Sequence, residues 1–134
     1  MKNSKMSHLI EAMSLAHHLL DEAARAYDPE APGGGPLYRE LLLDATGALG
    51  KARIYRAVLN SENIRKDLPA IYNAVSILAE NTKRSADTAD PDSPQYWESI
   101  RMHRYYQAQV DLCLQLSEEE YIALVPYYPY YYDE

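Results

Sequence analysis

The chain has 134 residues, which is enough for one domain that buries a hydrophobic core without disulfides or metals to support it. Its apolar share of 47% and charged share of 25% are typical of a soluble globular protein, and a single cysteine, Cys113, excludes an internal disulfide framework. The net charge is −7, and residues 87–134 hold ten acidic but only two basic side chains, which argues against binding of a phosphate backbone by this part.

The first predicted helix runs from Ser4 or Ser7 to Tyr27. Its apolar residues recur at alternating steps of four and three, which is the spacing of a helical stripe that faces a core. Three prolines and three consecutive glycines between Asp28 and Pro36 then predict a flexible loop. The apolar set, here called the N-terminal stripe, comprises Met6, Ile10, Met13, His17, Leu20, Ala24 and Tyr27.

The second predicted helix, Leu37 to Asn60, is apolar on two sides, which places it centrally in the fold or against a second subunit. Gly47 and Gly50 each cost up to about 1 kcal/mol relative to alanine in a helix interior. A close approach of another backbone would explain why glycine stands there, and the alternative is a local break in the helix. The two stripes hold Leu41, Ala45, Ala48, Ala52, Tyr55 and Leu59, and Leu43, Gly47, Gly50, Ile54 and Val58.

The third predicted helix, Ser61 to Ser85, carries the most regular pattern in the chain. Its stripe is narrow and needs partner helices to cover it. Pro69 lies within the pattern and predicts a kink, because proline lacks an amide hydrogen and its ring clashes with the preceding turn. The stripe contains Ile64, Leu68, Ile71, Val75, Leu78 and Thr82.

The fourth predicted helix, Pro94 to Leu116, begins after a Ser93 cap and is again apolar on two sides, which favours self-association. Ser117 and Glu120 form a capping-box pattern that predicts a short fifth helix through Leu124. One stripe of the fourth helix holds Tyr96, Ile100, His103, Gln107, Val110 and Leu114, and the other holds Trp97, Tyr105, Ala108, Leu112 and Leu116.

These elements predict an all-α fold, namely an antiparallel four-helix bundle with a short fifth helix and an extended C-terminal tail. Residues 1–116 would form the helical bundle, and residues 117–134 the short helix and a Tyr-rich acidic tail. No apolar run approaches the roughly 18 residues of a membrane span, and the first residues lack the pattern of a secretory signal. We therefore expect a cytoplasmic protein that does not bind membranes.

The tail combines aromatic area with negative charge, which predicts docking into a groove lined by arginine. The candidate receptor is a basic surface on the same subunit or on a neighbour, and the alternative is a disordered end without a role. The docking residues are Tyr127, Tyr128, Tyr130, Tyr131, Tyr132, Asp133 and Glu134, and the basic surface consists of Lys51, Arg53, Arg56, Arg65 and Lys66.

Two histidines interrupt apolar stripes and could meet across the bundle. His17 and His103, with Gln107 one turn further on, are interpreted as a hydrogen-bonded cluster that fixes the packing register. The alternative is a site for a ligand or a metal. No histidine has a glutamate three residues before it, so the paired Glu-x-x-His elements of di-iron bundles are missing from the sequence, and we predict no metal and no cofactor.

The sequence contains no convergent set of catalytic residues, so we predict a protein that is not an enzyme. We expect it to self-associate and to act through protein contacts, as an adaptor, chaperone-like factor, inhibitor or assembly subunit. Its partners would be further copies of the chain and a protein of unknown identity. Two alternatives stay open: a small-ligand or metal-binding bundle that uses His17 and His103, and a nucleic-acid-binding accessory protein that uses residues 51–66.

Overall fold

Four long helices make up most of the structure. The computed structural model describes residues 2–125, so the predicted docking segment Tyr127–Glu134 lies outside the described residues. This part of the chain contains helices and no strand, so the predicted all-α class with four long helices is confirmed. The helices are α1 (Lys2–Ala26), α2 (Pro36–Asn60), α3 (Ile64–Thr88) and α4 (Pro94–Glu119), with a short 3-10 turn, η1 (Pro32–Gly34), before α2.

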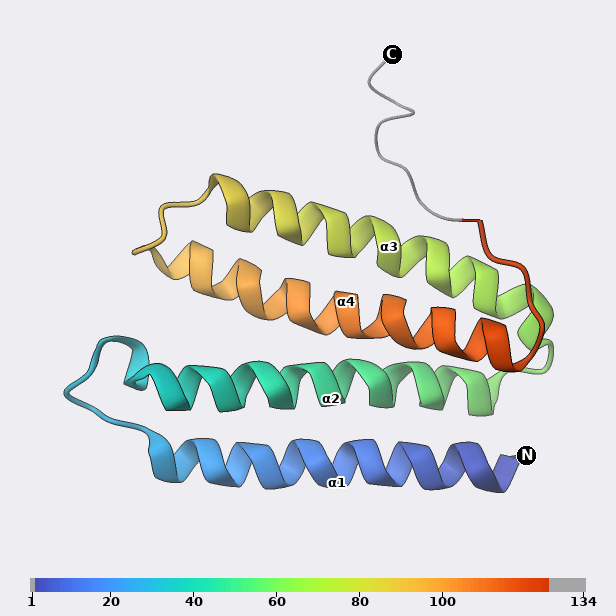
Figure 1. The fold of residues 1–134 in the computed structure, drawn as a ribbon, viewed down its shortest axis with the longest axis horizontal. Coiled ribbons are helices and arrows are strands. Elements are labelled where there is room, and N and C mark those ends of the chain that lie inside the picture. The colour runs from blue at the N-terminus through green and yellow to red at the C-terminus, as the bar shows by residue number, and fades with distance from the viewer. Residues whose placement is uncertain (1, 126–134) are drawn as a thin grey trace, which may run out of the picture.

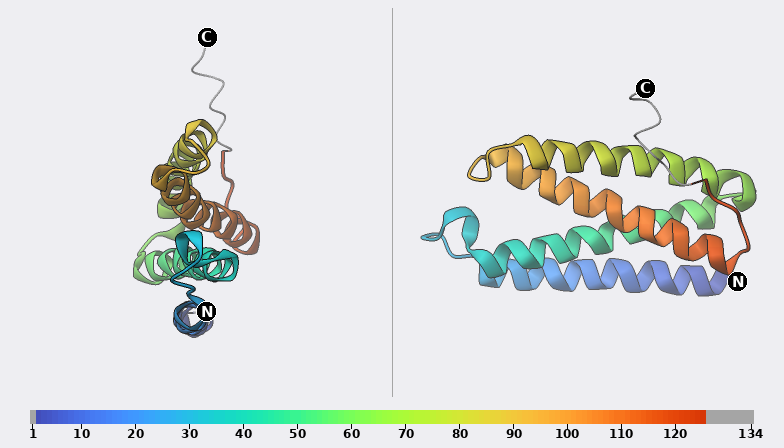
Figure 2. Two further views of the ribbon diagram at one scale, coloured as in Figure 1. Left: turned by 90° about the vertical axis from the view of Figure 1, so that its left-hand side faces the viewer. Right: turned by 45° about the horizontal axis from the view of Figure 1, so that its top comes forward.

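The helices pack in a row in the order α1, α2, α4, α3. Seen from the side they lie one above another, with α1 and α3 at the two ends (Figure 2). The chain reverses direction at each connection (Figure 1). The neighbours α2 and α4 therefore run parallel to each other, and the predicted antiparallel arrangement does not hold for this pair. Because α2 and α4 are the inner members of the row, each has a neighbouring helix on two sides.

Local sequence accounts for the turns between the helices. Gly33, Gly34 and Gly35 have φ angles of 63°, 86° and 95°, in the left-handed region that glycine adopts without a steric penalty. They let the chain turn back tightly, and the amide of Asp28 donates to the carbonyl oxygen of Gly34 at 2.9 Å across the loop. At the start of α4, the Ser93 hydroxyl accepts a hydrogen bond from the amide of Tyr96 at 3.2 Å, as the sequence predicts.

The apolar pattern of α2 is covered within one chain, and that of α4 is covered except at Leu114, which is 41% exposed. The α2 side that faces α1 is buried at Ala45, Ala48 and Ala52, and its opposite side is buried at Ile54 and Val58. Of the two explanations for a helix with two apolar sides, the central position applies. The main core lies where α2, α3 and α4 meet and includes Ile54, Leu68, Leu112, Cys113 and Leu116.

The predicted core face of α1 is wrong. Ala12, Ala16 and Ala23 are 9%, 1% and 1% exposed and face inward, whereas Met13 and Leu20 of the N-terminal stripe are 57% and 42% exposed. The physical reason is that α1 carries a second heptad-spaced row of small residues. Alanines on both helices let α1 approach α2 closely, and the larger side chains of the stripe are then turned aside.

The α3 pattern is partly confirmed. Leu68 and Val75 are buried as the stripe predicts, but Leu78 is 40% exposed and the buried line passes through Ala79 instead. The helix continues through Pro69 without interruption. Its buried residues are Leu68, Tyr72, Val75, Ser76, Ala79 and Ala86.

The short fifth helix is replaced by a helix-ending turn. The residues around Ser117 form the last turn of α4, and the amide of Ile122 donates to the carbonyl oxygen of Ser117 at 2.8 Å. The amide of Tyr121 donates to the carbonyl oxygen of Glu118, and Tyr121 has a φ of 55°. This is the Schellman pattern that stops a helix, and it buries Ile122 against the core. The predicted capping box therefore ends a helix and starts none.

Candidate functional site

The N-terminal stripe of α1 faces solvent over its whole length. Met6, Ile10, Met13, Leu20 and Tyr27 are between 42% and 57% exposed. From the first to the last residue the stripe extends about 32 Å at 1.5 Å per residue. Monomeric proteins rarely expose contiguous apolar patches larger than a few hundred Å², and larger ones mark interaction sites.

Two leucines of α2 extend this apolar surface. The ring of His8 stacks on Tyr55 at a centroid distance of 5.4 Å, and Tyr27 meets the edge of Tyr38 at 5.0 Å, which fixes the register of α1 against α2. Helical periodicity then places Leu42 and Leu49 on the flank of α2 beside the stripe. Leu49 is 43% exposed, so the apolar surface spans both helices.

The opposite flank of the α1–α2 pair is hollowed into a groove of about 800 Å³ that α4 closes. Its lining includes small or apolar residues from three helices and charged residues along its edges. Arg104 of α4 lies 3.5 Å from Asp44 of α2, between Nη1 and Oδ1. The lining residues are Ala12, Leu15, Leu19, Asp44, Gly47, Ala48, Lys51, His103, Arg104, Gln107, Ala108 and Asp111.

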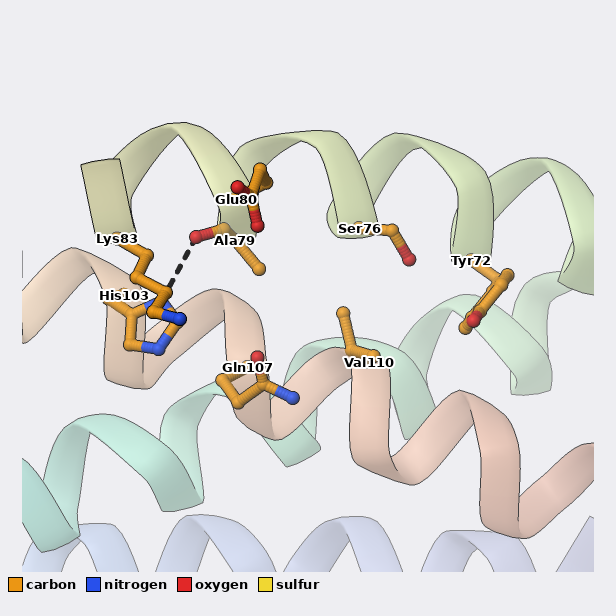
Figure 3. A pocket seen from close by; sticks show the side chains of 8 residues that line it. All are labelled: Tyr72, Ser76, Ala79, Glu80, Lys83, His103, Gln107 and Val110. Carbon is orange, nitrogen blue, oxygen red and sulfur yellow. Dashed lines mark hydrogen bonds between the residues drawn. The ribbon is translucent and has the colours of Figure 1, made fainter. Parts of the chain in front are cut away.

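A smaller and more polar cavity of about 320 Å³ lies between α3 and α4 (Figure 3). Its lining combines an acid, a base, two hydroxyls, an imidazole and an amide, so that it offers both hydrogen-bond donors and acceptors. The lining residues are Tyr72, Ser76, Ala79, Glu80, Lys83, His103, Gln107 and Val110.

His103 is held at the wall of this cavity by α3. Its Nδ1 lies 3.0 Å from the carbonyl oxygen of Ala79, and because a carbonyl only accepts, Nδ1 carries the proton (Figure 3). In the neutral ring, Nε2 is then an acceptor. His103 and Gln107 line both the cavity and the larger groove, so the two hollows adjoin across α4.

Ser76 supplies an unpaired hydroxyl to the cavity. It is 8% exposed, and its Oγ has no hydrogen-bond partner among residues 2–125. Figure 3 shows the hydroxyl on the side of α3 that faces α4. A buried polar group without a partner is destabilising by about 1–3 kcal/mol, so a bound polar molecule would relieve a cost that the protein carries.

The predicted cluster of His17, His103 and Gln107 does not form. The side chain of His17 is 81% exposed and its Nε2 lies 3.5 Å from Oδ2 of Asp21 on the same helix. Gln107 donates to Asp111 of its own helix at 3.0 Å, and His103 bonds to α3. The reason is that the stripe bearing His17 points away from α4, so the two histidines lie on different surfaces.

The predicted basic surface is divided. Lys51 lines the large groove, whereas Arg53 and Arg56 lie about 200° and about 140° around α2 from it, on the flank that carries Leu49. Lys66 is exposed at the start of α3. Arg65 donates hydrogen bonds to the backbone of Glu120 and Tyr121. The nucleic-acid alternative required one continuous basic surface, and this division weakens it.

The chain that leads into the tail is anchored to the helices. Arg65 donates from Nη1 and Nη2 to the carbonyl oxygens of Tyr121 and Glu120, both at 3.2 Å. Lys5 of α1 donates to Oε1 of Glu120 at 2.8 Å, and this hydrogen bond and the lysine charge lower the pKa of Glu120. One residue of the predicted basic surface, Arg65, therefore contacts the backbone just after the end of α4.

Cys113 lies in the core and is fully buried. Burial raises the pKa of its thiol to about 12, which leaves it protonated and unreactive at neutral pH.

No three His, Cys, Asp or Glu side chains in the described part of the chain gather closely enough to hold a metal ion. Over the same residues, no helix is long and apolar enough to cross a bilayer.

Sequence reasoning missed the two hollows. The groove exists because Ala12, Gly47, Ala48 and Ala108 are small. From sequence, Ala48 and Ala108 belong to apolar stripes, and Gly47 marks a close approach or a break in the helix. An excess of small residues at neighbouring stripe positions is the signal that could have revealed it. The cavity residues of α3 lie beside the predicted stripe, which does not include Ser76 or Lys83.

Comparison of this chain with protein-family models, with curated proteins and with solved structures finds no match.

Proposed function

We propose that this chain is a non-enzymatic, self-associating helical protein that acts through protein contacts, as an adaptor, chaperone-like factor, inhibitor or assembly subunit. The observation that carries the proposal is the exposed N-terminal stripe of α1. The two-sided patterns of α2 and α4, which favoured self-association at the level of sequence, are covered inside one chain except at Leu114 and no longer support it. The exposed stripe of α1 is now the reason to expect self-association.

The magnitude of apolar burial favours a partner that is itself apolar. Full burial of a leucine or methionine contributes roughly 2 kcal/mol, so covering five half-exposed side chains contributes about 5 kcal/mol for each copy. Two stripes that cover each other contribute about 10 kcal/mol, against an association cost of about 4–15 kcal/mol. At the lower end of this cost the balance is about −6 kcal/mol, so we expect weak association that becomes visible at roughly tens of micromolar and above.

Light scattering of the full-length chain over a range of concentrations tests this proposal. The mass is expected to rise above that of one chain as the concentration increases. Raising the ionic strength should leave this association intact, because apolar contacts are not screened by salt. A mass of one chain at every concentration would remove the proposal.

The Tyr-rich tail, Tyr127–Glu134, is proposed as a segment that docks to a protein surface. Its sequence supports this role, and Glu120 and Tyr121, which precede it in the chain, accept hydrogen bonds from the guanidinium of Arg65. Affinity capture with the full chain and with a chain that ends at Val125 tests the proposal. Loss of a partner on truncation is the expected result, and identical partners for the two chains would contradict it.

A second candidate function is the binding of a small polar molecule in the cavity between α3 and α4. The unpaired Oγ of Ser76 favours it, together with His103 and Gln107 at the cavity wall. The expected ligand effect is a rise in melting temperature with a panel of small polar molecules, lost in a Ser76→Ala variant. Ser85→Ala is the matched control, because Ser85 is exposed and bonds only within its own helix. No shift across the panel would dismiss this candidate.

A further inference from the structure

We infer that two copies of this chain join through α1, with their N-terminal stripes packed in antiparallel orientation. The inference rests on the proposed self-association and specifies its surface, its partner and its orientation. The stripe residues alternate by four and three positions, which is the spacing by which two helices interlock along a seam. Within the chain, α2 packs against the alanine row of α1, and the seam residue Tyr27 meets Tyr38 of α2. The rest of the seam lacks a second helix.

A second copy of the chain supplies a matching seam of equal length. Two identical surfaces related by a two-fold axis form the commonest kind of homo-oligomer contact. The flank of the α1–α2 pair, which includes Arg53 and Arg56 on α2, has an outline of about 37 Å by about 20 Å, or roughly 700 Å². This is close to the roughly 800 Å² that each partner buries in a stable interface.

Charge also favours a copy that docks on α1. Helix α1 contains three basic and three acidic residues, so two of these helices can meet without net repulsion. Residues 87–125 hold eight acidic residues and two basic ones. Much of this acidic segment lies in α4 and in the loop that joins it to α3, beyond α2 in the row. A copy that docks on α1 therefore meets a helix of balanced charge, and the acidic α4 stays outside the seam itself.

The side-chain volumes along the stripe favour the antiparallel orientation. A parallel pair would place Ala24 opposite Ala24 and His17 opposite His17, which leaves a void in one layer and two imidazoles in another. Two antiparallel registers interleave the seams over six layers, more than any other. In both registers Ala24 faces a methionine, and His17 faces Met13 or Leu20, so that every layer joins a large apolar side chain to its partner.

Disulfide trapping tests the surface and the orientation together. Because Cys113 is buried and its pKa is raised to about 12, introduced cysteines would be the only reactive thiols in the folded chain. A disulfide needs Cα atoms within about 7 Å. In both antiparallel registers, the two copies of residue 6 lie more than about 25 Å apart along the helix. All the altered positions are exposed, so folding should be retained.

The expected result, with diamide as the oxidant, is a disulfide between an Ala24→Cys chain and a Met13→Cys or Met6→Cys chain when the two are mixed. Met6→Cys alone should stay uncrosslinked, and so should Glu11→Cys, which lies on the side of α1 away from the stripe. Efficient crosslinking of Met6→Cys to itself would overturn the antiparallel orientation while leaving self-association intact. A dimer by light scattering without any stripe crosslink would overturn the surface. A monomer by light scattering would remove the proposed function and this inference together.

Discussion

Gly50 of α2 lies directly against the carbonyl oxygen of Tyr105 in α4. A Cβ atom at position 50 would overlap that oxygen and press on the Cβ of Ala108 at 3.4 Å. This explains why glycine stands in the middle of a helix, where it costs about 1 kcal/mol relative to alanine. Of the two sequence-based explanations, close backbone approach holds for Gly50, and α2 has no break there.

We therefore expect Gly50→Ala to lower the free energy of unfolding by about 1–3 kcal/mol, because the rigid carbonyl cannot move aside without separating α2 from α4. Gly47→Ala is the matched control. A Cβ at Gly47 would meet Arg104 Cδ at 3.7 Å, an ordinary contact, so this variant should gain up to about 1 kcal/mol. Urea unfolding of the two variants checks the pair, and equal effects would contradict the assigned contact.

Replacing Tyr121 with glycine should stabilise the protein. Tyr121 has a φ of 55° and is 88% exposed, so its side chain contributes little packing while its backbone is strained. The left-handed conformation costs a non-glycine residue about 1–2 kcal/mol, and glycine loses part of this gain through its flexible unfolded state. We expect a net gain of about 0.5–1 kcal/mol.

Tyr121→Ala serves as the control, because alanine removes the aromatic ring but retains the backbone penalty. Thermal unfolding of the two variants measures the difference. A rise in stability for Tyr121→Ala equal to that for Tyr121→Gly would show that the ring, and not the backbone, is unfavourable.

The ion pair between Lys5 and Glu120 should make stability depend on pH on the acid side. The hydrogen bond from Lys5, and then the lysine charge, lower the pKa of Glu120 below its ordinary value of 4.5. The folded state then holds its proton less tightly than the unfolded state. The contribution is present in full above the ordinary pKa and is lost as the pH falls through the folded pKa.

The pair is partly exposed, so its contribution should stay below about 1 kcal/mol. Urea unfolding of the wild type and of Glu120→Gln at several pH values checks this. The difference in stability should be constant near neutral pH and shrink below the ordinary pKa. A difference that grows on acidification would contradict the assigned ion pair.

The thiol of Cys113 should react only when the protein unfolds. Burial raises its pKa to about 12, so at pH 8 the thiolate is scarce and out of reach of reagents. A thiol-specific reagent should label the native chain slowly and the urea-unfolded chain at once. Rapid labelling of the native chain would show that the core around α4 opens readily.

The apolar periodicity of the sequence predicted where the four helices lie, but it did not predict which of their faces pack together. The stripes of α2, α3 and α4 marked helices correctly because apolar spacing reports a buried face. On α1 two such spacings coexist, one of alanines and one of larger side chains, and hydrophobicity alone favours the larger set. In the structure the alanine row faces α2, because two helices approach closely only where both carry small residues. This condition depends on the pair of helices and cannot be seen in the spacing of one helix.

The site was less predictable than the fold. His17 and His103 occupy equivalent stripe positions, but the first lies on the exposed stripe and the second bonds to Ala79 on α3. Their separation depends on which helices are neighbours in the row, and sequence spacing within one helix carries no such information. Ser117 and Glu120 show the same limit, since a capping-box pattern coincides there with a Schellman turn set by Ile122 entering the core.

The central claim is that the stripe of α1 joins copies of the chain, and sedimentation equilibrium of two matched variants tests it most directly. Leu20 and Leu15 lie on opposite sides of α1 with 42% and 51% of their surfaces exposed, so glutamate at either position should leave the fold intact. The account predicts one-chain mass for Leu20→Glu and wild-type association for Leu15→Glu. Association of Leu20→Glu as strong as that of the wild type, or equal loss in both variants, would contradict it.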